Sequence, residues 1–178
     1  MEFRFLLTVL AGTLAWASPA RADELFVGAY IHEVDTPLTR TVAEGGADVA
    51  FGYRFEPIED LRAIGSPAPY VIASLNTAGD TSFAGAGLAW TIGKGRFYLR
   101  SAIGLVVHDG DVHRIDPANG RDRGLGSRVL FEPEVALGWR ASERVAIEAS
   151  WMHMSHGLLF GDQNPGIDMM GLRLNLGL

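Results

Sequence analysis

Beyond residue 23, apolar and polar residues alternate with a period of two in eight separate segments. Since successive side chains of a strand point to opposite faces, each segment is predicted to be a strand with one apolar and one polar face. Most segments have about the 9–11 residues that a tilted strand needs to cross a hydrocarbon core. We therefore predict an all-β fold of eight antiparallel strands closed into a barrel. The segments are Glu24–Glu33, Gly46–Glu56, Pro69–Asn76, Ser82–Gly93, Gly95–Asp109, Ser127–Arg140, Arg144–Ser155 and Asp168–Leu178.

The polar faces of these segments combine small residues with charges of both signs, as a narrow interior would require. Buried charge is costly unless it is paired, so we expect the glutamates and arginines of this face to form ion pairs inside the barrel. They are Glu132, Glu134, Glu148, Arg54, Arg100 and Arg173. Many of the 22 glycines also fall within the segments, which is typical of bends and tight packing in a barrel.

Two kinds of barrel fit this alternation. In a soluble barrel, such as a lipocalin in the periplasm, the apolar row points inward; in a transmembrane barrel it points to lipid. Aromatic residues near the ends of the apolar rows favour the transmembrane barrel, because such residues form girdles at membrane interfaces. They are Phe55, Tyr70, Phe97, Trp139 and Trp151.

The links between segments support the same choice, because outer-membrane barrels have short periplasmic turns and longer extracellular loops. Two alternate links are tight, at 93–95 and 141–143, whereas the links at 34–45, 110–126 and 156–167 are long. The link from Pro57 to Ala68 is longer than expected for a periplasmic turn and has room for a helical turn.

The N-terminus has the pattern of a secretory signal. Arg4 precedes an apolar run from Phe5 to Trp16, and Ala20-Arg21-Ala22 has the small-x-small form of a cleavage site. We predict a cleavable signal peptide at residues 1–22 and an outer-membrane barrel domain at 23–178. The chain has no cysteine, which excludes a disulfide scaffold, and its net charge of −6 gives no reason to expect nucleic acid.

The candidate chemistry lies in the final hairpin. The apolar row of the seventh segment continues beyond Trp151 to His153 and Ser155, and the apolar row of the last segment begins at Asp168. A hydroxyl, an imidazole and a carboxylate therefore share the apolar face at one end of adjacent strands. Serine becomes a good nucleophile when a base accepts its proton and a carboxylate orients that base. On this face the natural substrate is an ester in the outer leaflet.

Plainer interpretations of these residues stay open. The three are also ordinary solvated residues of a strand end, which would make the protein a non-catalytic small outer-membrane barrel with a structural or binding role. The histidines outside the final hairpin are scattered over different segments, and no His, Asp or Glu spacing matches a metal site. We expect no metal and no cofactor.

The same hairpin carries a resemblance to a known family. The run His153-Met154-Ser155, then Gly157, then Asn164-Pro165-Gly166-Ile167-Asp168, resembles the lipid A 3-O-deacylase (PagL-type) family. The resemblance implies an enzyme of the bacterial outer membrane whose outward-facing triad hydrolyses the 3-O-linked acyl chain of lipid A. Its substrate would be lipid A or lipopolysaccharide in the outer leaflet. Whether the barrel forms a homodimer stays open.

The resemblance also implies a role for each residue. Ser155 would be the nucleophile, His153 the general base and Asp168 the orienting acid, while Asn164 and the backbone of Gly166 would be candidate oxyanion donors. Two positions depart from the family pattern. His156 stands where the family usually has Asn, and Asp168 stands where it often has Glu. These changes either leave the triad intact or weaken it.

Overall fold

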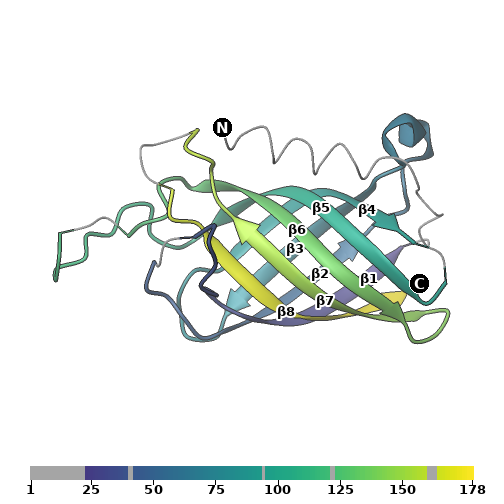
Figure 1. Ribbon diagram of the computed structural model, residues 1–178, viewed down its shortest axis with the longest axis horizontal. Helices are drawn as coiled ribbons and strands as arrows, with labels where there is room; N and C mark the ends of the chain where they lie inside the picture. The colour runs from purple at the N-terminus through teal and green to yellow at the C-terminus, as the bar shows by residue number, and fades with distance from the viewer. Residues whose placement is uncertain (1–22, 40–41, 94, 121–122, 160–163) are drawn as a thin grey trace.

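Eight antiparallel strands form a closed barrel in the computed structural model (Figure 1), which describes residues 23–39, 42–93, 95–120, 123–159 and 164–178. Each strand pairs with the next, and pairing of β1 with β8 closes the ring. The predicted all-β, eight-stranded antiparallel barrel is confirmed; the predicted signal peptide, residues 1–22, lies outside the described residues. The strands are β1 (Glu24–Ile31), β2 (Ala47–Arg54), β3 (Ala68–Asn76), β4 (Phe83–Ile92), β5 (Phe97–His108), β6 (Val129–Arg140), β7 (Val145–Met154) and β8 (Ile167–Gly177).

The links divide the barrel into two ends. The long β1–β2, β5–β6 and β7–β8 links lie at one end, here the loop end, and the β5–β6 link projects furthest from the barrel (Figure 1). The other end, here the turn end, carries the short β4–β5 and β6–β7 links and the C-terminus. This asymmetry is the one that the link lengths predict.

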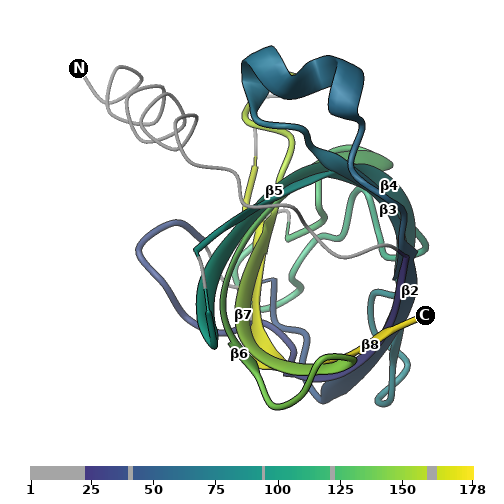
Figure 2. The same cartoon turned by 90° about the vertical axis from the view of Figure 1, so that its right-hand side faces the viewer.

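The long link at the turn end contains a short 3-10 helix, η1 (Glu59–Ile64), where the sequence left room for a helical turn. It lies outside the ring of strands, beside β3 and β4 (Figure 2). The indole N–H of Trp90 on β4 donates a hydrogen bond to the Ile64 carbonyl at 2.8 Å and so ties the helix to the wall. Among the described residues, no helix has the length and apolar character needed to cross a membrane.

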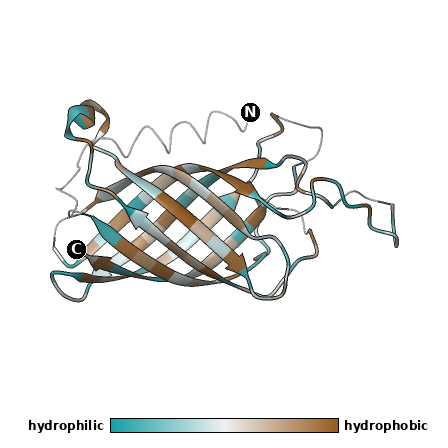
Figure 3. Cartoon of the chain, turned by 180° about the vertical axis from the view of Figure 1, so that it is seen from behind, coloured by the Kyte–Doolittle hydropathy of each residue, from teal (hydrophilic) through white to brown (hydrophobic). Residues whose placement is uncertain are grey.

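The two faces of the wall decide between the two kinds of barrel. The apolar row is exposed on the outside, as Phe51, Leu105 and Leu172 illustrate, whereas the charged row is buried inside. Hydropathy alternates along each strand accordingly (Figure 3). A soluble ligand-binding barrel would show the opposite arrangement, so this wall is built to face an apolar solvent.

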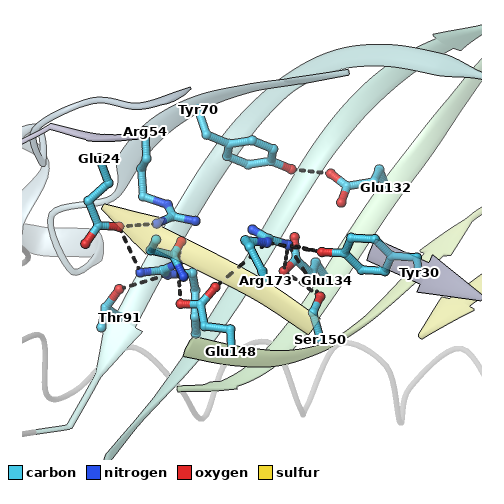
Figure 4. Close-up of polar contacts among 12 residues, drawn as sticks. Glu24, Tyr30, Arg54, Tyr70, Thr91, Glu132, Glu134, Glu148, Ser150 and Arg173 are labelled. Carbon is cyan, nitrogen blue, oxygen red and sulfur yellow. Dashed lines mark hydrogen bonds and ion pairs between the residues drawn. The ribbon is translucent and has the colours of Figure 1, made fainter. Parts of the chain in front are cut away.

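Ion pairs and hydrogen bonds between polar side chains lie in the interior of the barrel (Figure 4). Arg173 pairs with Glu134, and Arg100 pairs with Glu148, as the alternation predicts. Arg54 pairs with Glu24, and the Tyr98 hydroxyl donates to Glu148 at 2.6 Å. Buried charges that are paired and hydrogen-bonded in this way avoid the desolvation cost of an isolated ion.

Two predictions about this interior are wrong in detail. Among the described residues, Glu132 has no ion pair with an arginine; it accepts a hydrogen bond from the Tyr70 hydroxyl instead (Figure 4). Tyr70 therefore does not belong to an interfacial girdle, because it points inward and is buried. The reason is its parity: in β3 the even positions Tyr70 and Ile72 face the interior, while Val71 faces out.

Glycines on the inner face make room for the large interior side chains. A Cβ at Gly138 would lie 2.1 Å from the Tyr98 ring, and a Cβ at Gly52 would lie 2.3 Å from the Phe26 ring. A Cβ at Gly104 would lie 2.5 Å from the Tyr70 hydroxyl. Because no real contact is this short, the strand glycines are packing positions, as the sequence suggests.

At the loop end, the interior behind β7 and β8 is apolar, which the alternation alone does not predict. Met152 and Met154 of β7 and Ile167 and Met169 of β8 point inward and are fully buried. They pack in one cluster with buried residues of other strands and of the long loops, namely Val42, Val106, Leu125 and Leu130. The last residues of β7 and the first residues of β8, which carry the candidate chemistry on their outer side, thus have an apolar inner side.

Candidate active site

His153 and Asp168 lie directly opposite each other in the β7–β8 ladder. The His153 Nδ1 is 2.6 Å from the Asp168 Oδ1, and the Asp168 side chain is 0% exposed. A carboxylate accepts hydrogen bonds, so Nδ1 carries the hydrogen and donates a hydrogen bond to Asp168. This contact orients the imidazole and fixes its tautomer.

Ser155 follows the last residue of β7 and is held by a single bridge to β6. The Ser155 N–H donates to the Phe131 carbonyl at 3.1 Å, and the Phe131 N–H donates to the Ser155 carbonyl at 2.8 Å. The Ser155 Oγ lies 2.9 Å from the His153 Nε2. With Nδ1 protonated, Nε2 is the acceptor, so the serine hydroxyl donates to it. This is the geometry of a hydroxyl nucleophile, its base and the base's orienting carboxylate.

The chain from Ser155 to His153 to Asp168 lies on the outer wall at the loop end. His153 continues the outward row of β7 that contains Ile147 and Ala149, whereas its neighbours Met152 and Met154 are buried in the interior. Its side chain is 13% exposed, so the imidazole is partly covered and still reachable from outside. The structure thus brings together the three residues that the alternation places on this face.

The inner side of the same strand ends explains how the site stays in place. Each outward residue of the site alternates with a fully buried apolar one: Met152 and Met154 flank His153, and Ile167 and Met169 flank Asp168. Side chains locked in a dense core hold the backbone that carries the outward groups, and catalytic geometry tolerates little displacement. These buried apolar side chains of β7 and β8 are therefore the support of the site.

The sequence did not predict the contact that the β1–β2 loop makes with Asp168. The Thr36 hydroxyl donates to the Asp168 Oδ2, and the Val34 N–H donates to the Asp168 carbonyl oxygen at 2.8 Å. Thr36 and Asp168 are 132 residues apart in the chain, and no motif around Thr36 marks it as part of a site.

The segment that follows Ser155 returns to the site at residues 164–166. The Asn164 Oδ1 accepts the His156 N–H at 2.8 Å, which leaves the amide N–H groups of Asn164 available to other acceptors. Gly166 lies against the site, since a Cβ there would be 3.5 Å from the Ser155 Cβ. The side chain of His156 is fully buried. Both candidate oxyanion donors thus lie in a segment that is hydrogen-bonded to His156, the residue after Ser155.

A second cluster of charged residues is buried at the loop end, where His32 follows β1, Glu44 lies in the β1–β2 link and Asp48 lies on the inward row of β2. The His32 Nδ1 is 2.7 Å from the Asp48 Oδ2, and its Nε2 is 3.0 Å from the Glu44 Oε2. Burial alone lowers the pKa of His32, but hydrogen bonds and charge from Asp48 and Glu44 outweigh it and raise the pKa to about 9. No group of three or more His, Cys, Asp or Glu among the described residues has the geometry of a metal site.

Comparisons with known proteins bear on the family and the fold of the chain. The profile of the family described as lipid A 3-O-deacylase (PagL) matches residues 41–176. The crystal structure of the outer-membrane enzyme PagL is 14% identical, with a TM-score of 0.58 over 86% of this chain and 99% of that chain. Neisserial surface protein A is 12% identical, with a TM-score of 0.51 over 88% of this chain and 97% of that chain. A search of curated proteins finds no match. At these identities the structural likenesses show the barrel fold, while the profile shows the family.

Proposed function

Because the chain belongs to the lipid A 3-O-deacylase (PagL) family, we propose that Ser155, His153 and Asp168 are the catalytic triad with which it hydrolyses the 3-O-linked acyl ester of lipid A. The family is one of outer-membrane ester hydrolases, so the chain is an enzyme of that membrane and its substrate is a lipid. The observation that carries the proposal is the hydrogen-bonded chain from Ser155 through His153 to Asp168 on the apolar outer wall.

In the first half of the reaction Ser155 is the nucleophile. Its Oγ attacks the ester carbonyl carbon while its proton passes to the His153 Nε2, which already accepts that hydrogen bond at 2.9 Å. Asp168 stabilises the imidazolium that forms, because its carboxylate accepts the Nδ1–H. Collapse of the tetrahedral intermediate breaks the bond to the sugar oxygen, which takes the proton from Nε2. The acyl group remains on Ser155.

In the second half, water replaces the sugar. His153 accepts a proton from a water molecule as the water oxygen attacks the acyl carbon, and the resulting intermediate expels the Ser155 Oγ. The proton returns to that oxygen, and the fatty acid leaves. Every step uses only side chains of this chain and water, so the mechanism requires no cofactor.

The negative oxygen of each tetrahedral intermediate needs preorganised donors. We assign this role to the side-chain amide of Asn164 and the backbone N–H of Gly166. The bond from the His156 N–H to the Asn164 Oδ1 supports the assignment, because it turns the donor end of this amide away from His156. The closeness of Gly166 to Ser155 supports it as well.

The outward position of the triad determines which molecules can reach it. A water-soluble ester would have to enter an apolar wall, whereas an acyl chain of the outer leaflet already lies against the exposed side chains of that wall. Val129 and Met170 are examples on the strands next to β7. Lipid A in the outer leaflet therefore meets the triad with its acyl chains against the outer wall and its sugar at the loop end.

The test is mass spectrometry of lipid A from cells that express the protein. Wild-type protein should release a 3-hydroxy fatty acid, and Ser155→Ala should lower the rate by at least about a thousandfold, as loss of a triad nucleophile does. Ser101→Ala is the matched control, because Ser101 also lies in the outward row of a strand, on β5. If lipid A is deacylated equally by wild type and Ser155→Ala, the triad assignment is wrong.

A further inference from the structure

The carboxylate of Asp168 has two oxygens, and the triad uses only one of them. Its Oδ1 accepts from His153, and its Oδ2 accepts from the Thr36 hydroxyl. Because Asp168 is 0% exposed, water does not replace a lost donor easily, and a buried acceptor without a partner is costly. Thr36 therefore satisfies the half of the carboxylate that faces away from the imidazole.

The Thr36 hydroxyl is itself oriented. Its oxygen accepts the Leu38 N–H at 3.1 Å, in the manner of a local turn closed by a threonine side chain. With that lone pair engaged, the hydroxyl hydrogen points to Asp168. The Val34 N–H also binds the Asp168 carbonyl oxygen at 2.8 Å, so the loop contacts Asp168 at both its backbone and its side chain.

The rest of the β1–β2 loop is anchored independently of the triad. The Glu33 carboxylate accepts the backbone N–H groups of Val42, Ala43 and Glu44, which draws the two sides of the loop together. At its base, His32 lies between Asp48 and Glu44. The position of Thr36 is thus set by contacts that do not depend on substrate, as a preorganised support requires.

We propose that Thr36 is a positioning residue of the active site, which holds the Asp168 carboxylate in the plane that presents Oδ1 to the His153 Nδ1. The proposal rests on the triad assigned above and adds a fourth group to it from the first loop of the barrel. Thr36 acts through Asp168 and has no contact with the reacting atoms. Its loss should therefore lower kcat and leave KM nearly unchanged.

The test compares purified variants on lipid A in detergent micelles. Thr36→Val keeps the shape of the side chain and removes the donor, so kcat should fall by about tenfold or more, the effect of one hydrogen bond to a charged group. Thr36→Ser restores the donor and should recover most of the activity. Thr39→Val, a threonine change three residues away in the same loop, is the matched control and should leave kcat unchanged.

A double-mutant cycle separates positioning from general damage to the loop. In an Asp168→Ala background the acceptor of the Thr36 hydroxyl is absent, so Thr36→Val should change kcat by less than about twofold. An equal loss in both backgrounds would overturn the proposal, and so would a Thr36→Val enzyme with wild-type kcat while Ser155→Ala is inactive. That second outcome leaves the triad standing, whereas activity of Ser155→Ala removes the triad and this inference together.

Discussion

Gly166 lies against the imidazole of His153. A Cβ at position 166 would be 3.1 Å from the His153 Cε1 and equally close to the Met154 carbonyl oxygen. The residue also has φ of +70°, in the left-handed region that favours glycine. The turn into β8 thus brings backbone to the edge of the His153 imidazole, where an added Cβ would be packed tightly.

Gly166→Ala should lower kcat by about tenfold to a hundredfold, because small displacements of a catalytic group have large effects on rate. Gly157→Ala is the matched control. Gly157 has φ of +58° but nothing within 4 Å of a Cβ, so it shares the backbone strain and lacks the contact with His153. Both variants should lose about 1–2 kcal/mol of stability, and only Gly166→Ala should lose activity. Equal activities of the two variants would contradict the packing of Gly166 against the site.

Asp168→Glu tests whether the space between His153 and Thr36 accepts only the shorter acid. The added methylene lengthens the side chain by about 1.5 Å, while both oxygens of Asp168 already have partners and the residue is fully buried. The longer acid must displace either His153 or Thr36, so we expect kcat to fall by about tenfold or more. Steady-state kinetics on lipid A micelles give the answer. A Glu variant as active as wild type would mean that the site tolerates either acid.

The interior arginine Arg173 should be needed for stability and not for chemistry. It pairs with Glu134 and donates to the Tyr30 hydroxyl at 2.9 Å (Figure 4). Arg173→Leu leaves a buried glutamate without its cation, which should cost about 3–5 kcal/mol in the free energy of unfolding. Arg123→Leu removes the more exposed pair with Asp116 and should cost less than about 1 kcal/mol. Urea unfolding in lipid vesicles measures the midpoint of each variant. Equal midpoints would contradict the prediction that the two ion pairs differ in their contribution to stability.

The raised pKa of His32 predicts a dependence of stability on pH. With a pKa of about 9 in the folded protein against 6.5 in the unfolded chain, both states are protonated at pH values well below 6.5, and the full stabilisation is present there. As the pH rises from 6.5 to about 9, the unfolded state releases its proton first, so the free energy of unfolding falls. The contribution of His32 to stability is lost above about pH 9.

His32→Gln isolates this effect. The variant cannot carry the charge that Asp48 and Glu44 stabilise, so it should be less stable than wild type at about pH 6 and nearly equal to it at about pH 10. Unfolding midpoints at the two pH values measure the difference. A constant gap between the two proteins would show that the interaction does not depend on the charge of His32.

Much of this fold follows from the alternation of side chains along each strand. Because strand side chains alternate, the order of apolar and polar residues determined eight strands, an apolar outer wall and a charged inner face. Parity also placed His153 and Asp168 on the outside, since they continue the rows of Ile147 and Leu172. Strand limits observed in the structure differ from the predicted ones by at most two residues, as at Val129, where the pattern begins at Ser127.

Contacts between distant parts of the chain followed no such rule. The register of the β7–β8 hairpin places His153 directly opposite Asp168, while the closed barrel brings the Tyr70 hydroxyl to Glu132 and Thr36 to a carboxylate 132 residues away. The apolar cluster behind the site has the same origin, since it forms where long loops meet the strand ends. Alternation is a property of neighbouring residues and can be read along the chain. Partners across the barrel depend on strand register and loop path, which exist only after the ring has closed.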